Sequence, residues 1–540
     1  MKTLIDSNIL IYAYNLDSPF QKRAEEIIED IYQREINAYV ADINLIEFYS
    51  VITDGRKVER PLSPEDASNI LRHILKSDKF KKIYTTKEIV DQLPEQLKEA
   101  QVKRYGIYDH ILYLLMKGNN INSVITANEK DFKKFPFIKI VNPFADIIKC
   151  LRREGKRDSI IPYGHQWVDK TDIEAVVQVL RSAWLTTGPK VTEFEEAFAN
   201  FVGARYAVAV SSGTAALHAA MYAIGIKPGD EVIIPAMTFA ATANCVVFQG
   251  GTPVFVDVDP ETLLIDPDQV KAKITPRTKA IIAVDYAGHP CDYDALREIA
   301  DRHGLALVAD ACHALGATYK GRLVGSLADL NVFSFHPVKH ITTGEGGMIT
   351  TDNPDFAERM RIFRNHGITT DHRQREKQGS WFYEMVDLGY NYRITDIQCA
   401  LGLSQLNKLP GWVKRRQEIA QKYDAAFAKL PAIQPLKVRA DISHAYHLYV
   451  VRFDLSRLRA TRAEIFTALR AEGIGVNVHY IPVHLHPFYR ERFGTGPGLC
   501  PVAEAAYEEI ITLPLFPRMG DNDVEDVITA VRKVVRAYQK

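Results

Sequence analysis

Short apolar runs alternate with stretches of helical periodicity along most of the chain, and this alternation constrains the fold more than any other feature. Between residues 207 and 311 the runs AVAVSS, EVIIP, TPVFVDV, KAIIAVDY and ALVADA recur with helical stretches between them. Runs that are apolar at successive positions are typical of strands buried on both faces of a parallel sheet, which helical crossovers connect. The pattern predicts a large α/β domain.

The first 145 or so residues repeat this alternation on a smaller scale. Apolar runs lie in TLIDSNILIYAY, NAYVAD and NSVIT, and helical periodicity lies in QKRAEEIIEDIY and YDHILYLLM. A chain of 540 residues is also too long for one ordinary hydrophobic core. We therefore expect a separate α/β module with a parallel sheet at residues 1–145.

Two further boundaries follow from changes in the pattern. The charged stretch KCLRREGKRDS has no sustained apolar periodicity, which predicts a linker at residues 146–158 and a second domain at residues 159–540. Beyond residue 416 the expected elements are the strands HAYHLYVVRFD and GVNVHYIPV and a closing helix, VEDVITAVRKVVRAYQ. The second domain should therefore contain a large subdomain at about 175–415 and a smaller α+β subdomain at about 416–540.

Composition excludes several classes of protein. Lys plus Arg and Asp plus Glu each number 67, which argues against a basic nucleic-acid-binding surface spread over the whole chain. No apolar stretch approaches the roughly 18 to 20 residues of a membrane helix, and Asp6 interrupts the segment where a signal peptide is apolar. We therefore expect no membrane association and a cytoplasmic location. The six cysteines form no CxxC pair and are expected to be reduced.

One lysine follows a hydrophobic strand and precedes a glycine-rich turn, in FSFHPVKHITTGEGG. A lysine amine can form a Schiff base with an aldehyde cofactor and can carry a proton, and these are the two tasks of transamination. At the end of a strand, Lys339 could face a cleft. A solvated surface position is the common alternative for any single lysine.

Two other strand ends carry groups that suit a cofactor. Asp310 ends the apolar run LALVAD, where a carboxylate either pairs with a buried cation or caps a helix. Gly213 and Thr214 begin a helix after AVAVSS, where unpaired amide donors and the positive end of the helix dipole can bind a phosphate. Simple helix capping would use the same residue types, so both interpretations stay open.

Five strings occur in one order over residues 158–540: SSGTAALHAA, PAMTFAATAN, DACHALGA, FSFHPVKHITTGEGG and LGYNYRITDIQCALG. In these strings the chain resembles the sugar aminotransferases of the DegT/DnrJ/EryC1/StrS family. The resemblance implies an aspartate aminotransferase-like fold of type I. It also implies pyridoxal 5'-phosphate (PLP) as the cofactor.

The resemblance assigns roles to individual residues. Lys339 would carry the cofactor and move the proton, and Asp310 would pair with its pyridinium nitrogen. Phe239 would stack on the ring, and His313, where many relatives have Gln, would lie near the ring hydroxyl. Phosphate contacts are implied for Gly213, Thr214, Ser334 and, from a neighbouring subunit, Asn391. A homodimer with shared active sites is therefore implied.

The implied reaction transfers the amino group of L-glutamate to the C4 ketone of a UDP-linked 4-keto-6-deoxy-N-acetylhexosamine. Its product would be UDP-4-amino-4,6-dideoxy-N-acetyl-β-L-altrosamine, for pseudaminic acid biosynthesis, and another nucleotide-4-keto-sugar is the alternative substrate. Some relatives replace the lysine with histidine and become deoxygenating dehydratases, so Lys339 favours amination. Nucleotide-sugar contacts are implied for Thr187, His479, Tyr480 and His484, for which solvated surface positions are the alternative.

Four acidic residues of the first module each lie at an expected strand end or early helix turn: Asp6, Glu47, Asp109 and Asp131. Converging carboxylates bind Mg²⁺ or Mn²⁺, and a metal-held water can attack a phosphodiester. Helix capping explains acidic residues at such positions without any metal.

Over the first 143 or so residues the strings LIDSNILIY, LIEF, YDHILYLL and ITANEKDF resemble PIN-domain ribonucleases, including the VapC-type toxins. The resemblance implies a PIN-like fold and metal-dependent cleavage of RNA. Asn128 stands where some relatives carry Asp, which removes one possible ligand charge. Nucleotide-sugar amination is the expected main activity. A ribonuclease or toxin is the first alternative, and a binding protein without catalysis, which Lys339 and Asp310 disfavour, is the second.

Overall fold

The computed structural model divides the chain into two compact units. It describes residues 2–18, 20–33, 38–58, 60–99, 106–133, 135, 137–143, 160–370 and 372–540. Residues 1–157 with 463–472 form one unit, and residues 158–462 with 473–540 form the other. We call them the N-terminal unit and the C-terminal unit. The predicted linker at residues 146–158 lies outside the described residues.

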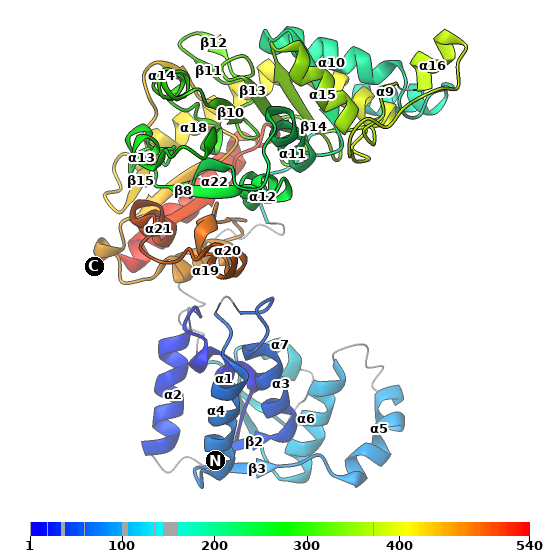
Figure 1. The fold of residues 1–540 in the computed structure, drawn as a ribbon. Helices are drawn as coiled ribbons and strands as arrows, with labels where there is room; N and C mark the ends of the chain where they lie inside the picture. The colour runs from blue at the N-terminus through cyan, green and yellow to red at the C-terminus, as the bar shows by residue number, and fades with distance from the viewer. Residues whose placement is uncertain are drawn as a thin grey trace. The chain divides into compact units, whose positions relative to one another are not determined.

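The N-terminal unit contains a five-stranded sheet in the order β3-β2-β1-β4-β5, in which every neighbouring pair is parallel (Figure 1). Its strands are β1 (Thr3–Ile5), β2 (Ala38–Ala41), β3 (Phe80–Ile83), β4 (Ser123–Ile125) and β5 (Lys139–Val141). Leu4 and Ile5 belong to two different apolar clusters because successive strand residues face opposite sides of the sheet. The predicted parallel α/β module is confirmed.

Helices connect these strands, as a parallel sheet requires. They are α1 (Ser7–Tyr14), α2 (Gln21–Gln33), α3 (Asp42–Ile52), α4 (Pro64–Lys76), α5 (Lys87–Glu99), α6 (Gly106–Gly118) and α7 (Glu129–Phe132). Asp6 is the N-cap of α1, and its side chain accepts a hydrogen bond from the backbone N–H of Ser7. This candidate metal ligand therefore also has the capping role that the sequence left open.

The C-terminal unit is built on a seven-stranded sheet in the order β6-β14-β13-β10-β9-β7-β8. The strands are β6 (Tyr206–Val210), β7 (Glu231–Pro235), β8 (Thr252–Val256), β9 (Thr278–Val284), β10 (Ala306–Asp310), β13 (Leu330–Ser334) and β14 (Gly347–Thr351). Only β14 runs antiparallel to its neighbours. Each of the five apolar runs in the sequence forms one of the strands, so the α/β prediction is confirmed.

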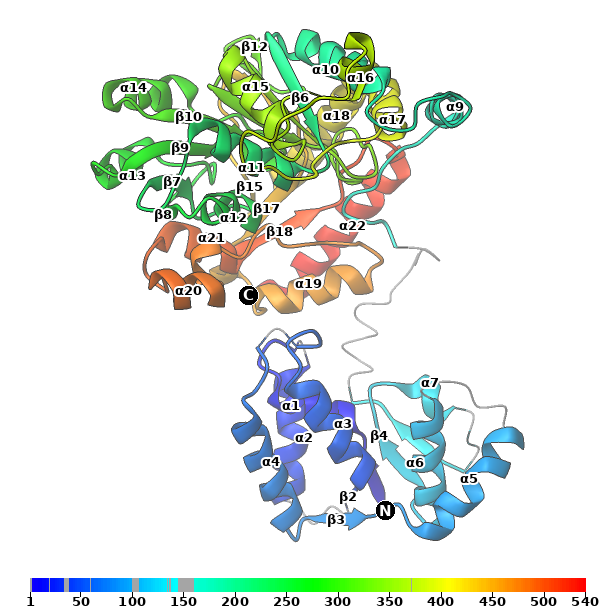
Figure 2. The same ribbon diagram turned by 45° about the vertical axis from the view of Figure 1, so that its right-hand side comes forward.

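Helices and short strands complete this large subdomain (Figure 2). The helices are α9 (Lys170–Leu180), α10 (Pro189–Val202), α11 (Gly213–Ile224), α12 (Ala240–Phe248), α13 (Pro267–Lys273), α14 (Tyr293–His303), α15 (Pro354–Phe363), α16 (His372–Gln378) and α17 (Asp396–Leu406). The short strands β11 (Thr318–Tyr319) and β12 (Arg322–Leu323) pair with each other, and β11 also pairs with β16 (Ile442–Ser443).

The smaller subdomain has an antiparallel three-stranded sheet in the order β15-β17-β18, made of Ile433–Pro435, Tyr449–Phe453 and Ile510–Leu513. Its helices are α18 (Leu409–Phe427), α20 (Pro487–Phe493), α21 (Pro501–Glu509) and α22 (Asp521–Tyr538), while α19 (Arg462–Ala471) falls almost wholly in the stretch assigned to the N-terminal unit. The predicted subdomain boundary near residue 416 lies inside α18.

The expected strand GVNVHYIPV is not a strand. Asn477 exchanges two backbone hydrogen bonds with Thr512, which makes one isolated bridge to β18. The chain then leaves the sheet, and Val478, His479 and Tyr480 line a cavity. Val476 and Val483 are buried, so the apolar residues of this segment pack inside the unit without forming a strand.

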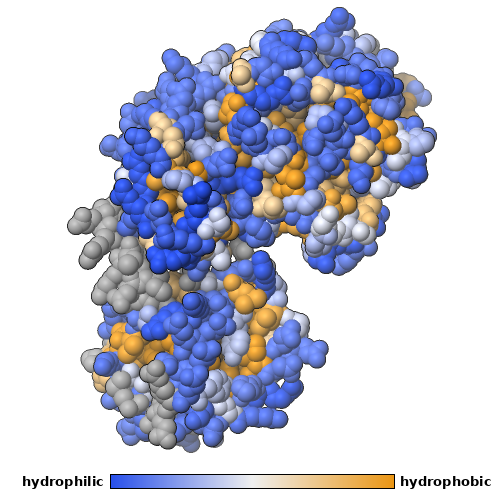
Figure 3. Space-filling view, turned by 90° about the vertical axis from the view of Figure 1, so that its left-hand side faces the viewer, coloured by the Kyte–Doolittle hydropathy of each residue, from blue (hydrophilic) through white to orange (hydrophobic). Residues whose placement is uncertain are grey.

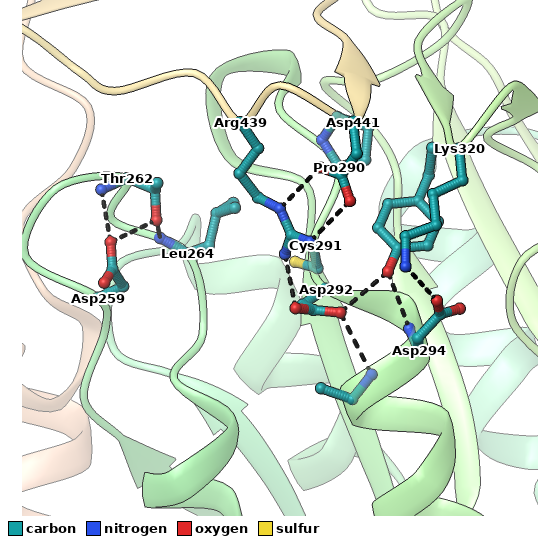
Figure 4. A network of polar contacts seen from close by, with 12 residues as sticks. Asp259, Thr262, Leu264, Pro290, Cys291, Asp292, Asp294, Lys320, Arg439 and Asp441 are labelled. Atoms are coloured by element: carbon teal, nitrogen blue, oxygen red, sulfur yellow. Dashed lines mark hydrogen bonds and ion pairs between the residues drawn. The ribbon is translucent and has the colours of Figure 1, made fainter.

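A network of ion pairs holds the segment before β16 against the large subdomain (Figure 4). Arg439 lies 2.7 Å from a carboxylate oxygen of Asp292, next to α14, and 2.9 Å from one of Asp441. The backbone N–H of Lys320 donates to the carbonyl of Asp441 over 2.8 Å. These contacts fix the chain shortly before it enters the cavity region.

On the face drawn in Figure 3, hydrophilic side chains cover most of the surface of both units, with apolar patches between them. No helix among the described residues is long and apolar enough to cross a membrane.

Candidate active site

A cavity of about 490 Å³ lies in the C-terminal unit, where several parallel strands of the large sheet end. Val284 ends β9, Asp310 ends β10 and Ser334 ends β13, and all three line the cavity. The carboxyl ends of parallel strands share one edge of a sheet, which is where open α/β sheets bind ligands. The predicted residues that line it are Gly213, Thr214, Phe239, Asp310, His313, Ser334, Lys339, His479 and Tyr480.

Lys339 follows β13 and is held by a turn in which its backbone N–H donates to the carbonyl of His336 over 2.9 Å. Its amine lies inside the cavity, 3.5 Å from Nε2 of His447. Burial lowers the pKa of Lys339, although the nearby Cys312 and Asp310 oppose that shift. A lower pKa leaves more of the amine unprotonated and therefore able to act as a nucleophile or a base. The alternative of a solvated surface lysine is wrong.

Asp310 is 7% exposed and is supported by neutral donors. The hydroxyl of Thr242 donates to Oδ2 over 2.7 Å, and the backbone N–H of Cys312 donates to Oδ1 over 3.3 Å. Residues 311–317 form turns, so Asp310 does not cap a helix. A buried carboxylate is costly unless a cation balances it, and a protonated pyridine nitrogen in the cavity would do so.

The helix α11 begins at Gly213, and the hydroxyl of its N-cap Ser212 accepts from the backbone N–H of Ala215 over 3.1 Å. A Cβ at Gly213 would lie 2.8 Å from the Cβ of Ser334, so only glycine allows this close approach. Helix N-termini bind anions through free N–H groups and the helix dipole. Ser212 therefore caps the helix, and Gly213, Thr214 and Ser334 line the cavity, so capping leaves room for an anion at this helix end.

Aromatic side chains form another wall of the cavity. Phe239 is 59% exposed, which excludes the alternative that it is a core residue, and its ring centroid lies 5.8 Å from that of Tyr480. The hydroxyl of Tyr480 lies 3.1 Å from Nε2 of His313. Burial lowers the pKa of His313 well below its ordinary value, so the ring is neutral and can accept or donate one hydrogen bond. Phe239, Tyr480 and His313 therefore suit a ligand with a flat ring that carries polar groups.

Three predicted residues lie outside the cavity. Thr187 lines a separate pocket of about 80 Å³ with Asn365 and Arg393. Asn391 is exposed and forms an isolated bridge with Asn365. His484 is fully buried, and its Nε2 lies 2.8 Å from Oε1 of Glu504, so neither a sugar contact nor a solvated surface position describes it.

Several residues that sequence reasoning missed also line the cavity: Tyr163, Cys312, Glu345, His447 and Asn477. Cys312 and Glu345 lie within strings already singled out, so their position beside Asp310 and Lys339 was the available signal. Tyr163 and His447 come from segments far away in the sequence. Nothing in their local pattern marks them.

In the N-terminal unit, the structure brings Asp6 and Glu47 together around one hydroxyl. The Oγ of Ser7 lies 2.6 Å from Glu47 and 3.4 Å from Asp6, and Asp6 also accepts from Asn8 and Thr126, both over 2.6 Å. Burial raises the pKa of Asp6 to about 6, and Glu47 adds to the rise. The two acids are therefore close enough to repel each other.

The predicted four-carboxylate metal site is not assembled. Asp131 is hydrogen-bonded to Asn128, the residue that replaces an expected acid. Asp109 lies in the first turn of α6. Within the part of the chain that the structure describes, no three His, Cys, Asp or Glu side chains stand close enough to hold a metal ion. Asp6 and Glu47 alone give two ligands, fewer than a hard divalent cation takes.

Comparisons with known proteins match each of the two units to a family. The sequence profile of the DegT/DnrJ/EryC1/StrS aminotransferase family matches residues 166–532, and that of the PIN domain matches residues 3–138. The spore coat polysaccharide biosynthesis protein SpsC of Bacillus subtilis is 46% identical over 383 residues, which cover 71% of this chain and 98% of SpsC.

Solved structures give the same result. A Streptococcus pneumoniae protein assigned as a sugar aminotransferase, in its PLP form, matches with a TM-score of 0.66 and 36% identity over 70% of this chain and 99% of its own. Helicobacter pylori PseC, an aminotransferase of pseudaminic acid biosynthesis, matches with a TM-score of 0.66 and 33% identity over 70% of this chain and 100% of its own. The C-terminal unit is a PLP-dependent sugar aminotransferase, the N-terminal unit is a PIN domain, and the chain belongs to the DegT/DnrJ/EryC1/StrS aminotransferase family.

Proposed function

We propose that the C-terminal unit transfers an amino group from L-glutamate to the C4 ketone of a UDP-linked 4-keto-6-deoxy-N-acetylhexosamine. The product is UDP-4-amino-4,6-dideoxy-N-acetyl-β-L-altrosamine, and the pathway is pseudaminic acid biosynthesis. The observation that carries the proposal is the cavity in which the amine of Lys339 and the carboxylate of Asp310 both lie. The similarity to PseC over the whole length of that enzyme supports the choice of sugar.

The cavity residues fit PLP by the chemistry of their donors. When bound, PLP supplies a ring that withdraws the electrons left on carbon when a proton is removed. Asp310 keeps the ring nitrogen protonated, because the buried carboxylate is stabilised by a positive neighbour. Gly213, Thr214 and Ser334 would hold the phosphate, and Phe239 would supply an apolar face for the ring, since all four line the cavity.

Lys339 both anchors the cofactor and moves the proton. With the cofactor and an amino donor in place, its amine would take the proton from the donor's α-carbon and return it to the carbon on the other side of the transferred nitrogen. The low pKa that burial gives Lys339 favours the unprotonated amine needed for the first of these steps. The same two tasks run in reverse on the keto sugar, so the kinetics are of the ping-pong type.

The proposed assembly is a homodimer with shared active sites. Asn391, which the family resemblance places at a neighbouring subunit's phosphate, is exposed and does not line the cavity of its own chain. The segment before it carries large apolar side chains that are exposed, including Trp381 at 85% and Leu388 at 67%. Exposed apolar segments of this size are typical of surfaces that a partner covers.

The proposal is tested by incubating the purified protein with glutamate and a panel of UDP-4-keto sugars, with product stereochemistry determined by NMR. We expect the altrosamine product and one 2-oxoglutarate per amino sugar. Amination of a different epimer, or of another nucleotide-4-keto-sugar, would replace the named substrate while keeping the reaction class. No transfer from glutamate to any member of the panel would contradict the proposal.

As a second candidate activity, we propose that the N-terminal unit cleaves RNA in a metal-dependent reaction. The PIN profile match and the approach of Asp6 and Glu47 to the Oγ of Ser7 support it. The test is incubation of the full chain with RNA and Mn²⁺. Cleavage that is lost in Asp6→Asn and in Glu47→Gln, the two acids that approach each other, would support the activity, and intact RNA in the wild-type reaction would count against it.

A further inference from the structure

A buried histidine lies beside the amine that does the chemistry. Nε2 of His447 is 3.5 Å from Nζ of Lys339, and both residues line the cavity. His447 is 5% exposed, and its ring centroid lies 4.4 Å from that of His313. Among the described residues, its Nδ1 has no hydrogen-bond partner. A buried ring nitrogen without a partner costs free energy, so packing alone does not explain a histidine here.

The backbone at His447 is held from two sides. Arg416, which is fully buried, donates from Nη1 to the carbonyls of Tyr446 over 3.1 Å and of His447 over 3.3 Å. On the other side, a Cβ at Gly288 would lie 2.8 Å from the backbone N of Tyr446, so glycine is required for this approach. The Arg439 network shown in Figure 4 fixes the same segment a few residues earlier. The imidazole is therefore placed by rigid backbone.

The groups that face His447 keep its ring neutral. They are Lys339, His313, His340 and Arg416. Burial first, and then the charge of Lys339, lowers the pKa of His447 well below its ordinary value. In the neutral tautomer with the proton on Nδ1, Nε2 is a hydrogen-bond acceptor. An ammonium or amine N–H of Lys339 can then donate to it.

We propose that His447 is a positioning residue for Lys339, whose free amine donates a hydrogen bond to Nε2 and is thereby held where it takes and returns the substrate proton. A lysine side chain is long and flexible, and much rotamer freedom is lost when it is ordered. An acceptor that fixes the amine beforehand reduces the freedom lost on reaching the transition state. The inference rests on the proposed function, because only in that reaction does the amine of Lys339 carry the substrate proton.

The first test uses the protein without PLP and therefore does not depend on the amino donor. The rate of Lys339 acetylation by acetic anhydride is measured against pH by mass spectrometry. In His447→Leu the midpoint should move down by about one pH unit, because a hydrogen bond donated by the charged form favours that form. His447→Gln should keep most of the wild-type midpoint. His110→Leu is the matched control, since His110 is as buried as His447, at 5%, but lies in α6 of the N-terminal unit.

The second test uses the holoenzyme and glutamate deuterated at the α-carbon. His447→Leu should lower kcat about tenfold with little change in KM, because the lost hydrogen bond acts on proton transfer and not on substrate binding. The deuterium isotope effect on kcat should increase, and His447→Gln should restore most of the rate.

An unchanged acetylation midpoint, or an unchanged isotope effect, in His447→Leu would overturn the proposal. A wild-type enzyme that does not use glutamate would instead contradict the proposed amino donor. In that case the acetylation midpoints still decide the role of His447.

Discussion

The two units each bury a carboxylate, but in different surroundings. Asp310 of the C-terminal unit is 7% exposed, accepts from the Thr242 hydroxyl and shares its cavity with the amine of Lys339. Asp6 of the N-terminal unit is 6% exposed, and its ionisable neighbour is a second acid, Glu47. One carboxylate therefore lies near a basic group, and the other lies near a group of the same charge.

The difference concerns how far each site is arranged in advance. In the C-terminal unit the start of α11, Asp310 and Lys339 already face one cavity of about 490 Å³. In the N-terminal unit two acids approach one hydroxyl, and no third ligand joins them among the described residues. Preorganised groups lose little freedom when the ligand binds. The cofactor site is therefore the better defined of the two.

The largest expected effect comes from Lys339→Ala, which removes the amine and leaves the rest of the cavity unchanged. Turnover should fall by at least about a thousandfold, because both the covalent anchor and the proton carrier are lost. The assay is 2-oxoglutarate formation from glutamate. His110→Leu, a buried substitution in the N-terminal unit, is the control and should keep wild-type turnover. Full activity in Lys339→Ala would show that the cavity does not carry the reaction.

The next effect comes from Asp310→Ala, which removes the carboxylate that balances the ring nitrogen. We expect kcat to fall on the order of a hundredfold, the usual result of losing one preorganised electrostatic contact. Rates are measured at saturating PLP, so that weaker cofactor binding is not mistaken for slower chemistry. Thr242→Val, which removes only the hydroxyl bonded to Asp310, should give a smaller decrease. Equal rates for Asp310→Ala and wild type would show that the Asp310 carboxylate does not act in the reaction, and the contrast drawn with Asp6 would be lost.

Much of the cofactor site could be predicted because its residues follow apolar strands. Gly213 and Asp310 follow or end a buried run, and parallel strands bring such ends to one edge, whereas Ser334 was implied only by the family resemblance. His447 and Tyr163 could not be predicted, since they reach the cavity from segments distant in the sequence. Local periodicity contains no information about such contacts.

Other expectations failed for related reasons. The 475–483 segment has the alternation of a strand, but only Asn477 bridges the sheet before the chain turns into the cavity. His484, which directly follows this segment, is buried, and its Nε2 lies 2.8 Å from Oε1 of Glu504. In the N-terminal unit only Asp6 and Glu47, of the four acids expected to converge, approach each other, around the Oγ of Ser7. The sequence pattern could not indicate that Asp131 is hydrogen-bonded to Asn128.

The pH dependence of the N-terminal unit tests the other side of the comparison. Burial raises the pKa of Asp6 from 3.8 to about 6, so the folded state holds this proton more tightly than the unfolded state. The contribution of Asp6 to stability is therefore complete below pH 3.8 and is lost as pH rises through about 6. Relative to Asp6→Asn, the wild type should lose about 2 kcal/mol between pH 4 and pH 7.

The measurement is hydrogen exchange of peptides from β1 and α1 in the full chain, corrected for the intrinsic pH dependence of exchange. Peptides from β9 and β10 of the C-terminal unit serve as the internal control and should show no difference between wild type and Asp6→Asn. If the two proteins show parallel pH curves in β1, Asp6 is not strained by its surroundings, and the contrast with Asp310 is lost.

The smallest expected effect concerns the ion pairs that prearrange the cavity region. Arg439→Ala removes contacts with Asp292 and Asp441, in which the side chains are 28%, 35% and 33% exposed. Partly buried ion pairs in a network contribute slightly more to stability than a solvated pair. The free energy of unfolding of the C-terminal unit should therefore fall by at most about 1 kcal/mol. Lys437→Ala is the matched control, because its pair with Glu261 is 62% and 58% exposed and should contribute almost nothing.

Thermal unfolding of both variants with PLP bound gives the comparison. Equal losses would mean that the Arg439 network does not fix the segment leading to His447, and the rigidity inferred for the cofactor site would then depend on Arg416 and Gly288 alone.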